Sequence, residues 1–281
     1  MTATKELISH KAILLWLSAI FIAAFTNISS ATETKNWLTS NETNTTAIDH
    51  QSWQLILNKY LISNHPSGVN LFDYKQVSSK DKKTLEKYLI SLQERDPRSY
   101  NKAEQKAYWI NLYNALTVQL ILNNYPVESI TKLGNTFFSF GPWDDDAAGI
   151  AGITLSLNDI EHKILRPIFK DPRIHYAVNC ASYSCPNLSG HAYTSSNTDQ
   201  LLNDGAFEYI NHPRAVKFDG DDLLLSSIYD WYLIDFGDNT TSLLNHLKQY
   251  ASDSLKKKLM SFDVESGDID HHYNWQLNEV K

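Results

Sequence analysis

The residues best suited to chemistry lie in one stretch, 174–188, which reads "IHYAVNCASYSCPNL" and holds both cysteines of the chain. Cys180 and Cys185 are five positions apart, and His175 precedes them. A thiolate becomes a nucleophile when a nearby base or cation lowers the pKa of the cysteine. Two cysteines at this spacing also form a local disulfide in an oxidising compartment. The stretch therefore predicts either a nucleophilic thiol or a disulfide-stapled loop, and both alternatives stay open.

Each cysteine is a candidate nucleophile, and the nearby histidines are candidate bases. We expect the stretch to begin as a strand, in which alternate side chains face opposite sides. His175 and Asn179 then share one face, while Cys180 lies on the other. This alternation argues against a direct pair between His175 and Cys180. It leaves His175 with Cys185, or Cys180 with His162 from the preceding helix.

Glu161 and Asn179 are candidates to orient the catalytic imidazole, as the third residue does in a Cys-His-Asn arrangement. Glu161 has a second interpretation, which we favour. Its carboxylate forms a buried ion pair with Arg173 or Arg166 and fixes a helix against the strand. Arg173 is also a candidate for ligand binding.

A metal site is a weaker alternative. Zinc binds cysteine and histidine, and the chain offers His162, His175, Cys180 and Cys185. Their spacing matches no compact zinc motif, so we predict no metal. The sequence also lacks a phosphate-binding loop and a dinucleotide fingerprint. We therefore predict no cofactor.

The first residues are typical of a secretory leader. Lys5 and Lys11 precede an apolar run at 12–25, which is shorter than the about 20 residues of a membrane-spanning helix. Small residues follow, as at signal-peptide cleavage sites. We expect 1–31 to be a signal peptide cleaved near Ala31, so that the mature protein is periplasmic or extracellular. The alternative is an uncleaved leader that anchors the chain to a membrane.

Composition limits the partners. Residues 32–49 are polar and rich in threonine, which predicts a flexible linker. The formal net charge of the chain is −7, without clusters of basic residues. Nucleic-acid binding needs such clusters, so we expect no nucleic-acid partner and membrane contact only through an uncleaved leader. The expected ligand is a peptide or small molecule of unknown identity.

The longest predicted helix runs from Asn101 to the proline at 126. Asn101 and Glu104 have capping-box spacing at its start. Asn111 and Asn114 interrupt its apolar sequence, and a buried amide is costly unless it is hydrogen-bonded. We expect both amides to bond the backbone of an adjacent loop, and ligand binding is the alternative. One buried face is predicted from the spacing of five residues: Ala103, Ala107, Ile110, Thr117 and Ile121.

The rest of the chain mixes helices with short strands. Helical spacing recurs at 52–62, 80–96, 199–211 and 241–260, and Ser156 with Asp159 caps a further helix. A hairpin is expected at 214–226 and a strand at 268–278. Regular alternation of strand and helix is missing, which favours an α+β fold. We predict a single helix-rich domain, 50–281, packed on a small mixed or antiparallel sheet.

Several blocks of sequence resemble the domain of unknown function 547 family. They are "KAYWINLYNALT", "LSLNDIEHKILRP", "DPRIHYAVNCASYSCPNL", "LSSIYDWYLIDFG" and "YNWQLN", in this order. The resemblance covers about 50–278 and implies a shared fold, but no reaction. One departure is Asn274 before Trp275, where the family pattern leads us to expect an aspartate.

Overall fold

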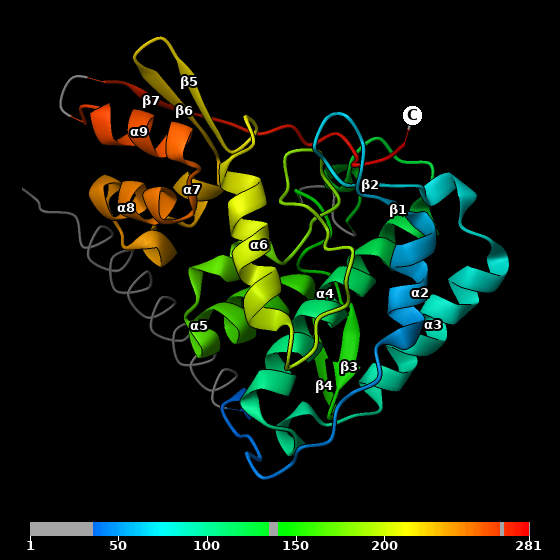
Figure 1. Cartoon of the computed structure of the whole chain (residues 1–281). Helices are drawn as coiled ribbons and strands as arrows, with labels where there is room; N and C mark the ends of the chain where they lie inside the picture. Colours follow the sequence, from blue (N-terminus) through cyan, green and yellow to red (C-terminus); the bar gives the residue numbers. More distant parts are fainter. Residues whose placement is uncertain (1–35, 135–139, 265–266, 281) are drawn as a thin grey trace, which may run out of the picture.

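A buried central helix organises the fold. The computed structural model describes residues 36–134, 140–264 and 267–280, so the predicted leader lies outside the described residues (Figure 1). Helix α4 (Lys102–Asn124) is buried along most of its length. The segments Ser79–Gln93, Pro97–Ser99, Asp159–Leu165 and Thr198–Ile210 pack against it, and the prediction of a single buried face is therefore too narrow. Of the five residues assigned to that face, only Ala103 is exposed.

Helical segments make up about half of the described chain, and α3 packs against both α2 and α4. The α-helices besides α4 are α2 (Gln51–Tyr60), α3 (Ser79–Gln93), α5 (Arg166–Phe169), α6 (Thr198–Ile210), α7 (Ile228–Trp231), α8 (Thr240–Tyr250) and α9 (Asp253–Ser261). The 3-10 turns are η1 (Tyr74–Gln76), η2 (Pro97–Ser99), η3 (Ile130–Lys132), η5 (Pro172–Tyr176) and η6 (Leu233–Phe236), and η4 (Asp159–Leu165) is a π-helical segment.

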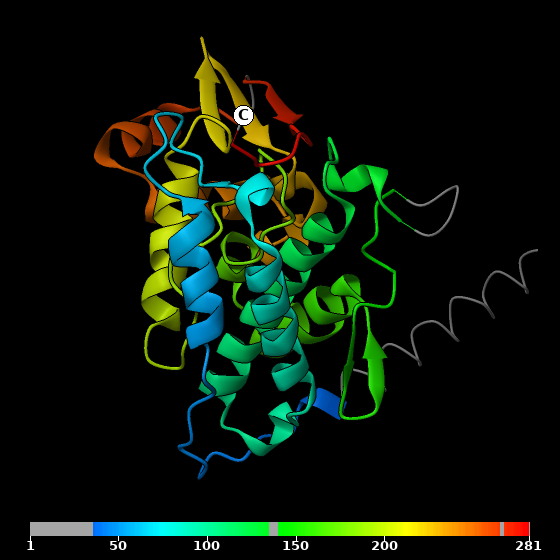
Figure 2. The same ribbon diagram turned by 90° about the vertical axis from the view of Figure 1, so that its right-hand side faces the viewer.

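The strands form three small sheets. Two are two-stranded antiparallel pairs, β1 (Leu61–Ile62) with β2 (Leu71–Phe72) and β3 (Ala148–Ile150) with β4 (Ile153–Leu155). The third is mixed: β5 (Val216–Asp219) and β6 (Asp222–Ser226) form the predicted hairpin, and β7 (Ile269–His272) runs parallel to β6. Figure 2 shows this sheet and the β3–β4 pair at opposite ends of the molecule. The α+β class is confirmed.

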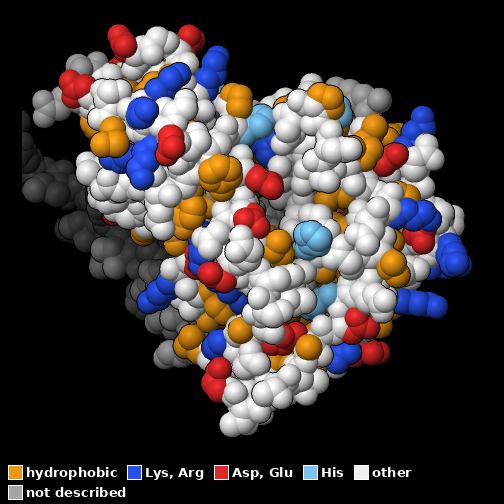
Figure 3. Space-filling view, in the orientation of Figure 1, with side chains coloured by type: hydrophobic (Ala, Val, Ile, Leu, Met, Phe, Trp, Pro, Cys, Tyr) orange, Lys and Arg blue, Asp and Glu red, His pale blue; other side chains and the backbone are white. Residues whose placement is uncertain are grey.

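Two groups of buried side chains form the core. The larger surrounds α4 and includes Trp53, Phe72 and Trp109. The smaller lies between α6, α8 and the β5–β7 sheet and includes Tyr209 and Tyr229. On the face shown in Figure 3, basic and acidic side chains are interspersed. Among the described residues, no helix is both long enough and apolar enough to cross a membrane.

The start of α4 also holds the segment 36–49. The Asn101 side chain accepts a hydrogen bond from the Glu104 N–H (2.9 Å), as a helix cap should. The Glu104 carboxylate does not complete the box, because it accepts from the Ile48 N–H at 2.7 Å. Trp37 packs edge-on against Trp109, with ring centroids 5.1 Å apart. These contacts attach the described part of the segment predicted as a linker to the domain.

The prediction of a strand at the start of 174–188 is wrong. Residues 172–176 form the 3-10 turn η5, and the following residues are irregular. Two local signals explain the difference. Pro172 occupies the first position of the turn, and the Asp171 side chain accepts a hydrogen bond from the Arg173 N–H. The argument from strand alternation therefore no longer separates His175 from Cys180.

Two asparagines of α4 hold this irregular region in place. Asn114 donates to the Ala177 carbonyl and accepts from the Asn179 N–H, both at 2.8 Å. Asn111 makes the equivalent pair of bonds with the backbone of Tyr193, at 2.7 and 2.9 Å. The expectation that both amides bond loop backbone is confirmed, and a role in ligand binding stays a prediction.

Replacing Asn114 should measure the contribution of these bonds. We predict that Asn114→Leu lowers the free energy of unfolding by about 2–4 kcal/mol, because it leaves a buried carbonyl and a buried N–H unpaired. Asn124→Leu is the control, since Asn124 is exposed and bonds only the Leu120 carbonyl within its own helix. Urea denaturation of both variants measures the difference. Equal losses would contradict the assigned role of Asn114.

Candidate functional site

A cavity of about 560 Å³ adjoins the cysteine stretch. Segments far apart in the sequence form its walls. Its lining is Tyr113, Phe140, Gly141, Trp143, Asp144, Asn158, Glu161, His175, Val178, Cys180, Cys185, Pro186, Ile228, Trp231, Tyr232, Tyr273 and Trp275. Four of the predicted site residues are therefore brought to one cavity: Glu161, His175, Cys180 and Cys185.

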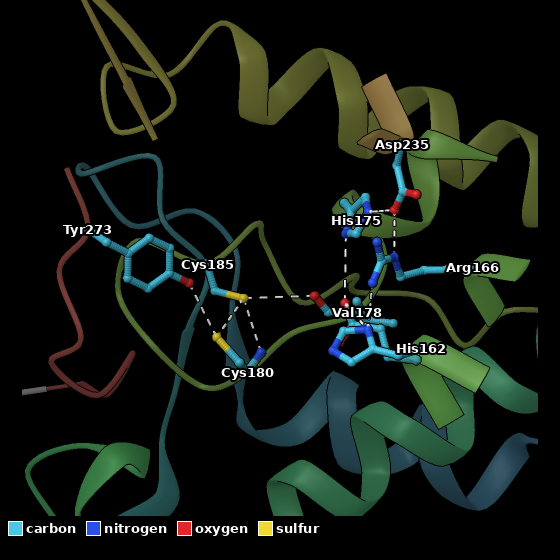
Figure 4. A network of polar contacts seen from close by, with 9 residues as sticks. His162, Arg166, His175, Val178, Cys180, Cys185, Asp235 and Tyr273 are labelled. Atoms are coloured by element: carbon cyan, nitrogen blue, oxygen red, sulfur yellow. Dashed lines mark hydrogen bonds and ion pairs between the residues drawn. The ribbon is translucent and has the colours of Figure 1, made fainter. Parts of the chain in front are cut away.

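Cys180 is the partly exposed cysteine of the pair. Its sulfur lies 3.1 Å from the Cys185 Sγ and 3.3 Å from the Tyr273 hydroxyl (Figure 4). The Ser182 Oγ is also 3.1 Å from this sulfur. All three groups can donate a hydrogen bond to a thiolate, which favours the charged form. The hydrogen bond from Cys185 has the largest effect and, with the two hydroxyls, lowers the pKa of Cys180 below its ordinary value, although burial opposes the shift.

Cys185 is buried and has the opposite character. Its sulfur accepts a hydrogen bond from the Cys180 N–H at 3.0 Å and lies 3.8 Å from the Val178 carbonyl. Burial raises the pKa of the Cys185 thiol. The structure thus distinguishes the two cysteines: Cys180 is suited to be the thiolate, and Cys185 to be its protonated donor.

The predicted disulfide is not formed in the structure. Both cysteines are free thiols, and their sulfurs are 3.1 Å apart, whereas a covalent S–S bond measures about 2.05 Å. The sulfurs are in contact, because the loop that joins them folds back. Ala181 has a φ of 59°, in the left-handed region that residues other than glycine rarely adopt.

Asn179 maintains this turn. Its side-chain oxygen accepts from the Ala181 N–H at 2.9 Å, and its amide donates to the Pro186 carbonyl at 2.7 Å. The Asn179 side chain therefore bridges the two sides of the loop. It does not line the cavity.

His175 is anchored by a residue that the sequence reasoning missed. Its Nε2 lies 2.6 Å from Asp235 Oδ2, and the same oxygen accepts from Arg166 Nε at 2.5 Å. Burial alone raises the pKa of Asp235, but the bonds from His175 and Arg166 together outweigh it and lower that pKa to about 2. Tyr232 stacks on the imidazole, with centroids 4.3 Å apart. The carboxylate and the ring together fix the orientation of His175.

Glu161 faces the other nitrogen of His175. The distance from Glu161 Oε1 to His175 Nδ1 is 3.7 Å, longer than a hydrogen bond. Glu161 lies in η4, a π-helical segment that starts with reciprocal bonds between Ser156 and Asp159. Such segments are often found at functional sites. The residue is 6% exposed, and its carboxylate accepts no hydrogen bond from the described residues.

The arginine partners predicted for Glu161 bond elsewhere. Arg166 pairs with Asp235, and Arg173 pairs with Asp171 at 2.9 Å and Asp199 at 2.8 Å. The prediction of an ion pair between Glu161 and one of these arginines is thus wrong for the described residues. Arg173 is not among the residues that line the cavity.

His162 lies beside this network. Its Nδ1 is 3.0 Å from Arg166 Nη1, one helical turn away, and burial lowers its pKa. The neutral imidazole accepts the hydrogen bond from the guanidinium. Neither His162 nor His175 makes a hydrogen bond to a sulfur within the described residues, so a direct Cys-His contact is not present. The described part of the chain also shows no cluster of three or more His, Cys, Asp or Glu residues arranged to hold a metal.

Sequence comparison identifies the region that contains the cysteines. Residues 97–210 match the model of a family described as "Protein of unknown function, DUF547". The chain contains a DUF547 domain. The match confirms the resemblance found in the sequence over 97–210, within the wider region of about 50–278 that the resemblance covers. No match was found among curated proteins or among solved structures.

The DUF547 match covers only part of the site. It includes Glu161, His175 and both cysteines, but it ends before Asp235 and Tyr273. The signal that pointed to these last two residues was their place in the "LSSIYDWYLIDFG" and "YNWQLN" blocks, which gives no spatial information. Asn274, where an aspartate was expected, bonds Ser184 through its backbone and Gln276 through its side chain.

The hydrogen bonds at Cys180 predict the pH dependence of its alkylation. We expect iodoacetamide to modify Cys180 with a midpoint below the pKa of about 8.5 of an ordinary thiol. Cys185→Ala and Tyr273→Phe should each move the midpoint upward, because each removes a donor to the thiolate. Cys185→Ser retains a donor and should move it less. Rates measured against pH, with the modified residue located by mass spectrometry, provide the test. An unchanged midpoint in Cys185→Ala would contradict the assignment.

Proposed function

We propose that the protein is a thiol-dependent hydrolase or transferase, with Cys180 as the nucleophile and His175 as the general acid and base. One observation carries the proposal. The sulfur of the partly exposed Cys180, surrounded by three hydrogen-bond donors, shares a cavity of about 560 Å³ with an imidazole held by the partly buried carboxylate of Asp235. Perturbed titratable groups that meet in a cavity are typical of catalytic sites.

The proposed reaction is acyl transfer in two steps. The Cys180 thiolate attacks a carbonyl carbon of the substrate, and a C–S bond forms as the bond to the leaving group breaks. His175 gives a proton to the leaving group. Water or another acceptor then attacks the thioester and loses its proton to His175, which releases the acyl product and regenerates the thiolate.

Asp235 and Arg166 have positioning roles in this proposal. Asp235 accepts a hydrogen bond from the His175 Nε2–H, so that Nδ1 is the nitrogen available to the cavity. Arg166 holds the Asp235 carboxylate at 2.5 Å. The low pKa of Asp235 keeps it charged at neutral pH, which stabilises the imidazolium formed during the reaction. In enzymes without bound substrate, the distances between catalytic groups are often long. We therefore expect substrate binding to bring the His175 imidazole and the Cys180 sulfur to their catalytic distances from the reacting atoms.

An activated ester tests the proposal. With p-nitrophenyl acetate, the wild-type protein should release a burst of nitrophenolate and gain one acetyl group on Cys180, as seen by intact mass and peptide mapping. Cys180→Ser should lose the burst. His175→Gln should slow acylation by about a hundredfold or more, since general acid–base catalysis contributes 10²–10⁴.

His271→Asn is the matched control for His175→Gln. His271 is exposed on β7 and does not line the cavity, so its replacement should leave the burst unchanged. A burst that survives Cys180→Ser would overturn the assignment of the nucleophile.

A second candidate function rests on the contact between the two sulfurs. The protein could be a non-catalytic binding or envelope-interaction module whose 174–188 segment is stapled by a Cys180–Cys185 disulfide. The separation of 3.1 Å requires a shift of only about 1 Å to reach bonding distance. Export favours this alternative, and we propose a periplasmic or extracellular location from the predicted leader at 1–31.

Oxidation distinguishes these functions. Diamide should convert the purified thiol form into an intramolecular Cys180–Cys185 disulfide, because the sulfurs already touch. Alkylation and the nitrophenolate burst should then disappear, and reduction should restore both. Cys185→Ser is the control and should form no internal disulfide. Protein isolated from its native compartment without reductant should carry free thiols if it is the proposed enzyme, and no alkylatable thiol if it is the stapled module.

A further inference from the structure

An aromatic wall forms one side of the cavity. It consists of Phe140, Trp143, Trp231, Tyr273 and Trp275. Trp275 is its centre: Trp231 stacks on it at 5.5 Å with planes 23° apart, and Tyr273 lies at 4.5 Å. Phe140 and Trp143 contact the same ring from other directions, at 5.3 and 5.6 Å. Four aromatic side chains from three segments of the sequence thus converge on one indole.

Part of this wall is open to solvent. Trp231 is 46% exposed and Phe140 is 66% exposed. Large aromatic side chains stabilise the folded state more when they are buried than when they are exposed to water. A contiguous aromatic surface that stays accessible inside a cavity is therefore typical of a ligand-binding site.

The charge of the cavity specifies the ligand further. Its described lining includes the carboxylates of Glu161 and Asp144 but no lysine or arginine. Asp144 accepts a hydrogen bond from the Asn158 side chain at 2.7 Å. Glu161 is more than nine-tenths buried, and the nearest cationic candidates among the described residues, His175 and His162, lie 3.7 and 3.9 Å away.

The Glu161 carboxylate lines the cavity and accepts no hydrogen bond from the described residues. A carboxylate that is largely shielded from solvent is stabilised by a positive charge beside it. The side chains that could have supplied this charge are committed elsewhere. Arg166 bonds Asp235, and His175 bonds the same carboxylate through Nε2. The negative charge of Glu161 is therefore available to a cationic ligand. It lies at the edge of an aromatic surface, and the faces of aromatic rings carry partial negative charge that also attracts cations.

We propose that the cavity binds an alkylammonium group, quaternary or protonated, against the aromatic wall with Glu161 as its counter-charge. A neutral ring would stack on the indoles but leave Glu161 uncompensated. A bare metal ion would find too few hard ligands in an aromatic surface. This inference rests on the proposed function for the reaction. It adds the substrate class: acyl compounds that carry an alkylammonium group.

Choline and its neutral isostere 3,3-dimethylbutan-1-ol test the proposal directly. Both are titrated against the intrinsic tryptophan fluorescence of the purified protein, at an ionic strength held constant with sodium chloride. Choline should bind in the millimolar range, and the neutral alcohol should bind about tenfold more weakly, because it lacks the cation–π and ionic contributions. Equal binding of the two compounds, or no binding of choline, would overturn the inference.

Two variants locate the bound cation. Trp231→Leu removes an exposed ring of the wall, and Glu161→Gln removes the charge while keeping the shape. Each should weaken choline binding about fivefold to tenfold. Phe207→Leu and Glu86→Gln are the matched controls, since both residues are exposed on helices outside the cavity lining, and both should leave the affinity unchanged. Unchanged affinity in Glu161→Gln would overturn the role of the counter-charge.

The titration is repeated with Cys180→Ser, which separates this inference from the proposed function. Choline should bind this variant as it binds the wild type, since the ammonium site does not include the sulfur. If choline binds but no acylation occurs, the proposed reaction fails and the ammonium site stands. If acylation occurs but choline does not bind, the reaction stands and the ammonium site fails.

Discussion

The geometry of the site depends on one amide. Asn114 lies in a helix that is buried on nearly every side, and its side chain bonds the backbone on both sides of Val178. These bonds fix where the irregular chain leaves η5, and hence where Cys180 begins. Regular secondary structure would have satisfied those backbone groups itself. Because the stretch is irregular, a side chain from the core has to do so, and a buried amide that bonds both a donor and an acceptor suits this role.

The charged groups around His175 form a chain in which each group compensates the next. Arg166 is shared between Asp235 and His162, and Asp235 is shared between Arg166 and His175. Tyr232 covers both the imidazole and the guanidinium, whose carbon lies 4.8 Å from its ring centroid. This sharing leaves Glu161 as the carboxylate with the weakest compensation. The cavity thus has two sides. At His175 the charges are compensated within the protein, and at Glu161 a ligand can supply the compensating charge.

Local signals in the sequence predicted much of the fold. The cap at Asn101, the reciprocal pair of Ser156 and Asp159, and the hairpin at 214–226 all depend on residues a few positions apart. The prediction of a strand at 174–180 was wrong because the β-prone residues of this stretch are a stronger sequence signal than the short turn at Asp171-Pro172. The cysteine stretch was identified from residue type alone. Its partners Asp235 and Tyr273 were not, because they reach the cavity through tertiary packing that no spacing encodes.

The parallel pairing of β7 with β6 has a consequence for the order in which the site is completed. It carries Tyr273 to the Cys180 sulfur across 93 positions of sequence. A chain made or translocated from its N-terminus therefore presents Cys180 and Cys185 long before the tyrosine hydroxyl arrives. Until then the thiolate lacks one of its three hydrogen-bond donors, although Cys185, the donor with the largest effect, is only five positions away. The set of donors around Cys180 is thus complete only when the C-terminal strand has paired with the last sheet.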